Sequence, residues 1–198
     1  MSDLPKSKRI LIIDPHEITR LGYISLLKSR RANIHFEEAA SFPEAQNLIT
    51  LQKWDLVILE LCLPGRSCLE LLDQISDLHL ESPVLVSSVY DEGSYGIRSI
   101  RRGVSGFISK TATANEFVKA VEMMLEGKKY LSASLIQGLM SAVHPSAQAQ
   151  PHEELSDREF QVLQRLAHGV SIKHMASEMC LIRFIHTDWC NGKISNSV

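Results

Sequence analysis

Four polar residues that each follow an apolar run could do chemistry together. Asp14 and Glu60 are carboxylates, Ser88 carries a hydroxyl group and Lys110 carries an amine. Two carboxylates can share a hard divalent cation, which prefers oxygen ligands, or they can pair with an amine as ions. Which of these the chain can do depends on the elements that position the four side chains.

Apolar runs that alternate with helical patterns indicate a parallel sheet wrapped by helices over residues 1–127. The clearest strand runs are at 9–13, 55–61, 83–89 and 106–109. Counting strand–helix units gives five, so we expect a doubly wound, five-stranded α/β sheet. Sites in such sheets form at the carboxyl ends of the strands, which is where Asp14, Glu60, Ser88 and Lys110 lie.

Helix signals separate the expected strands. Ser41 with Glu44, and Thr113 with Glu116, have the spacing of capping boxes, in which two side chains bond reciprocally to two backbone N–H groups. The helix after Asp14 has apolar residues roughly on one face. These residues are Ile18, Leu21, Leu26 and Leu27.

The chain is expected to divide into three parts. Residues 1–127 form the sheet domain, and 128–154 form a further helix and a polar linker bracketed by prolines. Residues 155–198 begin with two short helical patterns that meet at Gly169, which is the first half of a helix-turn-helix. After Leu181 the helical period fails, so this small all-α segment is expected to be incomplete.

Composition limits the classes of function. The 198 residues are 44% hydrophobic with a net charge of −2, which is not the balance of a generally basic protein. Four scattered cysteines lack CxxC spacing, which favours free thiols over zinc or disulfides. No apolar run approaches the ~20 residues that span a bilayer, and no signal peptide is evident, so we expect a cytoplasmic protein without a membrane partner. No nucleophile–base pair or cofactor loop is found, so we do not expect an enzyme.

The residues at the strand ends and in the last segment resemble the NarL/FixJ family of response regulators, over about residues 8–181. The receiver part of the likeness is carried by Asp14-Pro15-His16, Glu60, Pro64-Gly65, Ser88, Phe107 and Lys110. The LuxR-type DNA-binding part is carried by 155–159, 162–163, 167–169, 171–173 and Ala176. The resemblance implies a flavodoxin-like receiver followed by a LuxR-type helix-turn-helix.

The resemblance also implies that the chemistry of the receiver is altered. Glu60 stands where the family has its phosphate-accepting Asp, and Asp14 is one of two acids that hold Mg²⁺, with Pro15 in the place of the other. The extra methylene of Glu60 displaces its oxygens by roughly 1.5 Å from those of an Asp, and a misplacement of about 1 Å can lower a rate by about 10²-fold. We therefore expect neither ordinary phosphorylation nor a resident cofactor, and Mg²⁺ fits Asp14 and Glu60 poorly.

Three interpretations of Glu60 remain open. Ser88 matches the family hydroxyl that closes on the phosphate, Phe107 the aromatic whose rotation reports activation, and Lys110 the family lysine. In the first interpretation Glu60 pairs with Lys110 and holds Ser88 and Phe107 in a permanent active-like arrangement. In the second, the same pair is only structural in a disabled switch. In the third, the receiver accepts another signal from a partner protein or a small ligand.

Contact with DNA is expected to be weak and to involve Ser171, Lys173 and Arg183. Ser171 and Lys173 fall on the scaffold helix, from which side chains touch phosphate and position the protein without reading bases. Basic and acidic residues nearly balance over 155–198, which is poor electrostatics for DNA.

The patterns together predict an atypical two-component response regulator that acts as a DNA-binding transcription regulator without phosphorylation. The alternative is a receiver-type interaction or dimerisation module whose DNA binding is impaired or absent. The expected partners are DNA and copies of itself or related response regulators. The sequence identifies neither a histidine kinase nor target genes.

Overall fold

The structure is a computed structural model of the chain. It describes residues 7–63, 66–77, 81–90 and 92–143, together with Glu159, Val162, Leu163, Leu166 and Gly169. The chain divides into two compact units. The first unit contains Met1–Leu63 and Ser67–Gln148, and the second contains Pro64–Arg66 and Ala149–Val198.

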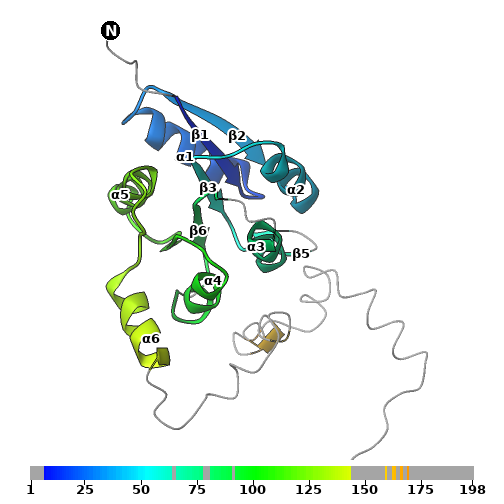
Figure 1. Cartoon of the computed structure of the whole chain (residues 1–198), viewed down its shortest axis with the longest axis vertical. Helices are drawn as coiled ribbons and strands as arrows, with labels where there is room; N and C mark the ends of the chain where they lie inside the picture. Colours follow the sequence, from blue (N-terminus) through cyan, green and yellow to red (C-terminus); the bar gives the residue numbers. More distant parts are fainter. Residues whose placement is uncertain are drawn as a thin grey trace, which may run out of the picture. The chain divides into compact units, whose positions relative to one another are not determined.

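Five parallel strands form the sheet of the first unit (Figure 1). They are β1 (Lys8–Ile13), β2 (Ile34–Ala39), β3 (Leu56–Leu59), β6 (Val84–Ser88) and β7 (Gly106–Ser109). Their order is β2-β1-β3-β6-β7, so the chain runs to one side of β1 and then to the other. The predicted doubly wound sheet is confirmed. Two short strands, β4 (Cys62–Leu63) and β5 (Arg66–Ser67), follow β3.

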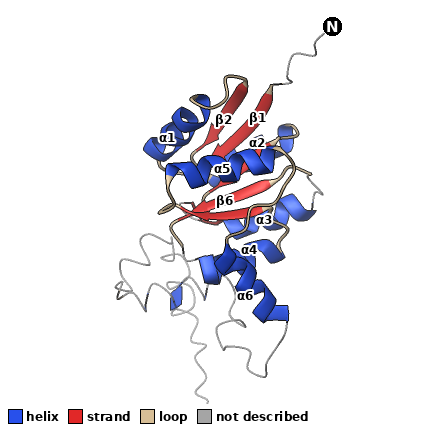
Figure 2. Ribbon diagram, turned by 90° about the vertical axis from the view of Figure 1, so that its left-hand side faces the viewer, coloured by secondary structure: helices blue, strands red, loops and turns tan. Residues whose placement is uncertain are grey.

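Helices cover both faces of the sheet, α1 and α5 on one face and α2 and α3 on the other (Figure 2). The helices are α1 (Glu17–Lys28), α2 (Phe42–Leu51), α3 (Cys68–Asp77), a π-helical turn η1 (Glu92–Gly96), α4 (Ile97–Arg101), α5 (Ala114–Leu125) and α6 (Ala133–Val143). Residues 10–13 of β1 are fully buried, as expected of a strand covered on both sides.

The buried face of α1 differs from the predicted one. Leu27 is buried, but Ile18 is 86% exposed and Leu21 is 54% exposed. At 3.6 residues per turn, Ile18 lies about 180° around the helix from Leu27, so both cannot face the sheet. The rotation of α1 was set by the residues near its end, Tyr23, Ile24 and Leu26, which pack against the core together with Leu27.

The two predicted capping boxes have different outcomes. At the start of α5, the Thr113 N–H donates to Glu116 Oε2 at 2.8 Å and the Glu116 N–H donates to Thr113 Oγ1 at 3.3 Å, so this box is confirmed. At the start of α2, the Ser41 side chain makes no capping bond, and Glu44 Oε2 accepts from the Ala40 N–H at 2.8 Å instead, so this box is not formed as predicted.

Two sequence expectations outside the sheet can be placed. The helix expected before the linker is α6, and it belongs to the first unit. In the second unit, Glu159, Val162, Leu163 and Leu166 are helical, and Gly169 forms a turn with φ +72°. The division of the chain at residues 127 and 154 stays a prediction. Among the described residues, no helix is both long and apolar enough to cross a membrane.

Candidate functional site

The carboxyl ends of four strands bring the predicted residues to one edge of the sheet. Ser88 is the last residue of β6, and Asp14, Glu60 and Lys110 directly follow β1, β3 and β7. Backbone bonds continue one residue beyond the strands: the Glu60 N–H donates to the Ile13 carbonyl at 2.9 Å, and the Lys110 N–H donates to the Ser88 carbonyl at 2.8 Å. The starting point of each functional side chain is therefore fixed by the sheet itself.

Lys110 bridges the two carboxylates. Its Nζ lies 2.5 Å from Asp14 Oδ2 and 2.7 Å from Glu60 Oε2. The side chains of Asp14 and Glu60 are 3% and 1% exposed, and that of Lys110 is 14% exposed. A buried charge is costly unless it is paired and hydrogen-bonded, so the three groups depend on one another.

The other oxygen of Glu60 is held by two donors. Ser88 Oγ, which belongs to a fully buried residue, donates to Glu60 Oε1 at 2.6 Å. The backbone N–H of Cys62 donates to the same oxygen at 3.0 Å. The bond from Cys62 was not predicted, although an acid that accepts from the N–H two residues later is a common local motif.

Asp14 has the same local motif. The His16 N–H donates to Asp14 Oδ1 at 2.8 Å, and His16 Nδ1 lies 3.1 Å from that oxygen. Arg20 donates to the Asp14 backbone carbonyl at 2.8 Å. The contact between His16 and Asp14 was not predicted; the place of His16 two residues after Asp14 and directly before α1 was the signal that could have linked the two.

The electrostatics of the site favour a protonated lysine. Burial alone would lower the pKa of Lys110, but its hydrogen bonds to Asp14 and Glu60 and their negative charges raise the pKa above its ordinary value. Tyr23 lies beside the site with its hydroxyl 2.7 Å from Ser87 Oγ, and burial raises the pKa of this phenol. The cluster thus places one ammonium group between two acidic side chains.

The donor set does not fit Mg²⁺. Each of the four carboxylate oxygens of Asp14 and Glu60 already faces a donor from the protein, and Pro15 supplies no side-chain oxygen. Mg²⁺ requires near-octahedral oxygen ligands, whereas here the Lys110 ammonium occupies the space between the two acids. Across the part of the chain that the structure describes, no group of three or more His, Cys, Asp or Glu residues is placed to hold a metal.

Phe107, the remaining predicted residue of the pocket, lies in β7 and is fully buried. Its backbone N–H donates to the Tyr130 carbonyl at 3.3 Å. The predicted DNA contacts Ser171, Lys173 and Arg183 lie outside the described residues. The structure therefore brings together Asp14, Glu60, Ser88 and Lys110 and does not place the DNA-contacting set.

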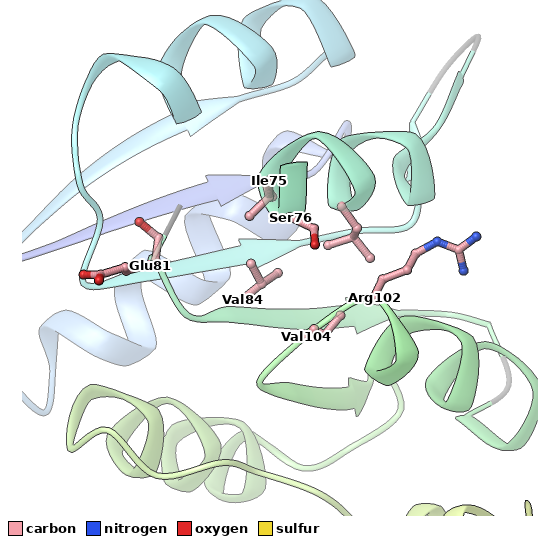
Figure 3. A pocket seen from close by; sticks show the side chains of 9 residues that line it. Ile75, Ser76, Glu81, Val84, Arg102 and Val104 are labelled. Carbon is pink, nitrogen blue, oxygen red and sulfur yellow. The ribbon is translucent and has the colours of Figure 1, made fainter. Parts of the chain in front are cut away.

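A separate hollow of about 330 Å³ lies at the opposite end of the sheet, between α3 and the turn before β7 (Figure 3). Apolar side chains from α3 and β6, including Ile75 and Val84, line it with Val104, while Glu81 and Arg102 stand at its rim. It contains none of the predicted site residues. The cluster of polar site residues and this hollow therefore lie at different ends of the sheet.

The sequence of this chain is similar to one protein family and to several known proteins. The response regulator receiver domain family matches residues 10–122. The Fimbriae Z protein of Salmonella typhimurium is 31% identical over 179 residues, which cover 89% of this chain and 83% of that protein. The "Probable transcriptional regulatory protein NarL" of Mycobacterium tuberculosis is 30% identical over 175 residues, which cover 88% of this chain and 81% of that protein.

The fold of this chain is also similar to that of a solved response regulator. A LuxR-family two-component response regulator from Aurantimonas sp. superimposes with a TM-score of 0.62 at 26% identity. The match covers 71% of this chain and all of that chain.

Proposed function

This chain belongs to the response regulator family, and from that premise we propose that it is a transcription regulator whose receiver works without phosphorylation. The observation that carries the proposal is the bonding of Glu60, whose two oxygens engage Lys110 and Ser88 at 2.7 and 2.6 Å. The family resemblance matches Ser88 to the hydroxyl that closes on a bound phosphate and Lys110 to the family lysine. Glu60 therefore makes, from within the chain, the contact to Ser88 that a bound phosphate would otherwise make.

The same contacts disfavour transfer of a phosphoryl group. An attacking carboxylate needs an oxygen free to approach the phosphorus in line, but Glu60 Oε1 accepts bonds from Ser88 and Cys62, and its side chain is 1% exposed. A phosphoryl donor would have to break these bonds and displace Lys110. We infer that the receiver is held in one arrangement, active-like, with Phe107 buried.

The proposed output is DNA binding through the second unit. The support is the LuxR-type likeness at 155–159 and 167–169 and the name of the Mycobacterium relative, a transcriptional regulatory protein. The proposed partners are DNA and further copies of this chain or of related response regulators. The near balance of charge over 155–198 favours a second candidate, an interaction module that binds response regulators rather than DNA.

Intact-mass measurement tests the phosphorylation part of the proposal. The full chain is incubated with a small acyl phosphate and Mg²⁺, and we expect no phosphoryl adduct. The matched control is the double variant Pro15→Asp with Glu60→Asp, which restores both acids and should gain the adduct. A phosphoryl group on Glu60 or Asp14 of the unaltered chain would contradict the proposal.

Binding to random-sequence duplex DNA tests the output. Phosphate contacts release counterions, so we expect the affinity to fall steeply with salt and to be equal with and without the phosphodonor. Glu60→Gln should weaken binding if Glu60 maintains an active-like receiver and leave it unchanged if the ion pair is only structural. No salt-dependent binding at all would favour the interaction module.

A further inference from the structure

The hollow between α3 and the turn before β7 has the size and lining of a small-ligand site. Its volume is about 330 Å³. Figure 3 shows the side chains of Ile75 and Ser76 from α3 on one side and those of Val84 and Val104 on the other. The three apolar residues are buried. Concave sites of about 300–1,000 Å³ with mostly apolar walls are typical of small-molecule binding.

The backbone of the turn before β7 forms part of the wall. Gly103 lines the hollow and has a φ of +84°, a conformation that favours glycine. Within the part of the chain that the structure describes, a Cβ atom at Gly103 would have no heavy atom within 4 Å. The next residue is fixed by its backbone, since the Val104 N–H donates to the Ser99 carbonyl at 3.3 Å. No side chain of this turn glycine therefore fills the space.

Polar bonds anchor the walls on both sides of the hollow. On one side, Arg102 Nε donates to Asp73 Oδ1 at 2.9 Å, which connects the turn to α3. On the other side, the N–H of the buried Trp54 donates to Ser82 Oγ at 3.0 Å. A site that is formed in advance loses less conformational entropy when a ligand binds.

The charges at the rim are already paired. Arg102 forms an ion pair with Asp73, and Glu81 forms one with Lys53. A charged ligand would have to compete with these partners or lose its hydration against the apolar floor, and an unpaired charge is costly to bury. The hollow therefore favours a ligand without charge.

Two hydroxyl groups can orient such a ligand. Ser82 Oγ accepts from Trp54, and a hydroxyl group that accepts a bond also has a hydrogen to donate. Ser76 brings a second hydroxyl group to the wall formed by α3. A ligand with one hydroxyl group of its own could accept from Ser82 and donate to Ser76.

We propose that this hollow binds a small uncharged molecule that consists of an apolar ring with one hydroxyl group. The ring contacts Ile75, Val84 and Val104, and its hydroxyl group bonds to Ser82 and Ser76. Such a ligand would give the receiver a chemical input at a place that contains none of the residues of the Glu60 site. The inference goes beyond the proposed function and does not depend on it.

Titration of the full chain with phenol and with benzoate tests the proposal. The methyl NMR signals of Ile75, Val84 and Val104 report on the hollow, and those of Ile12 in β1 serve as a reference. We expect a dissociation constant on the order of 1 mM for phenol, because so small a molecule offers few contacts. Benzoate has the same ring but carries a charge, so it should bind at least about tenfold more weakly. Equal binding of the two compounds, or no shift with phenol, would overturn the proposal.

Two phenylalanine variants locate the binding. Ser76→Phe places a ring in the hollow and should weaken phenol binding about tenfold or more, because an occupied pocket excludes the ligand. Asp77→Phe is the matched control, since Asp77 is an exposed neighbour on α3 that does not line the hollow. It should leave the affinity for phenol unchanged, and the signals of Ile12 should show that both variants are folded.

The remaining outcomes also decide the matter. Equal phenol affinity in Ser76→Phe and the unaltered chain would overturn the proposal. If Ser76→Phe does not fold, the comparison of phenol with benzoate decides alone. If the hollow instead receives a side chain of a second copy, dilution of the ligand-free chain would shift the signals of Val84 and Val104, and this result would also overturn the proposal. None of these readouts involves DNA or phosphate, so they can fail while the proposed function holds, and the reverse.

Discussion

Ion pairs at the two ends of the sheet differ in how strongly the charged partners within each pair depend on one another. At the carboxyl end, one ammonium group serves two carboxylates that are 3% and 1% exposed. At the amino end, the Lys53–Glu81 pair has a comparable distance, 2.5 Å, but its side chains are 70% and 79% exposed. Distance alone therefore says little about the importance of a charge. Burial decides it, because water can replace a lost partner only at the exposed end.

The largest effect is expected from Lys110→Ala, which leaves two buried carboxylates without their cation. Removing one partner of a buried ion pair typically costs about 3–5 kcal/mol. Urea denaturation should show this loss as a large fall in the free energy of unfolding. The triple variant that adds Asp14→Asn and Glu60→Gln should recover part of it, since the uncompensated charges are gone. A loss below about 1 kcal/mol would mean that water enters the site.

A smaller effect is expected at high pH, where Lys110 loses its proton. The pKa of Lys110 is raised in the folded chain, so its stabilising contribution is complete below the unfolded pKa of about 10.4 and is lost as the pH rises through the folded value. Denaturation midpoints measured across alkaline pH should therefore fall more steeply for the unaltered chain than for the triple variant. Equal slopes would show that Lys110 is not the group responsible.

The smallest effect is expected from Lys53→Ala at the amino end. Exposed ion pairs often contribute nothing measurable, so the midpoint of thermal unfolding should not shift beyond experimental error. A shift as large as that of Lys110→Ala would remove the contrast between the two ends.

Parallel topology made the site predictable from the sequence. Four strands that run the same way must end at one edge, so residues as distant in the chain as Asp14 and Lys110 had to meet there. The pairing of Glu60 with Lys110 followed from the length of the glutamate arm. The ion pair between Lys110 and Asp14 could not be predicted in this way, because two carboxylates can share one amine only in particular rotamers that depend on the surrounding packing.

Other features depended on tertiary contacts that local patterns do not contain. The exposure of Ile18 follows from the rotation of α1, which the packing of its last two turns decides. Glycine at positions 96 and 138 allows the close contacts of α6 with η1 and α4, and neither glycine indicates by itself which helix will approach it. Glycine within a helix is ordinarily only a weakening residue, so its presence does not signal close packing.

In the proposed phosphorylation-independent receiver, the lysine shared by Asp14 and Glu60 also limits how mutation could restore phosphate chemistry. Changing Glu60 to Asp alone shortens the arm that reaches Lys110 but restores no second metal ligand at Pro15. Changing Pro15 to Asp alone adds a third acid beside a single ammonium group. Each first step would thus carry a cost without a gain in function, and the two substitutions are useful only together. On this proposal, a receiver that accepts phosphate is reached by single substitutions only through an unfavourable intermediate.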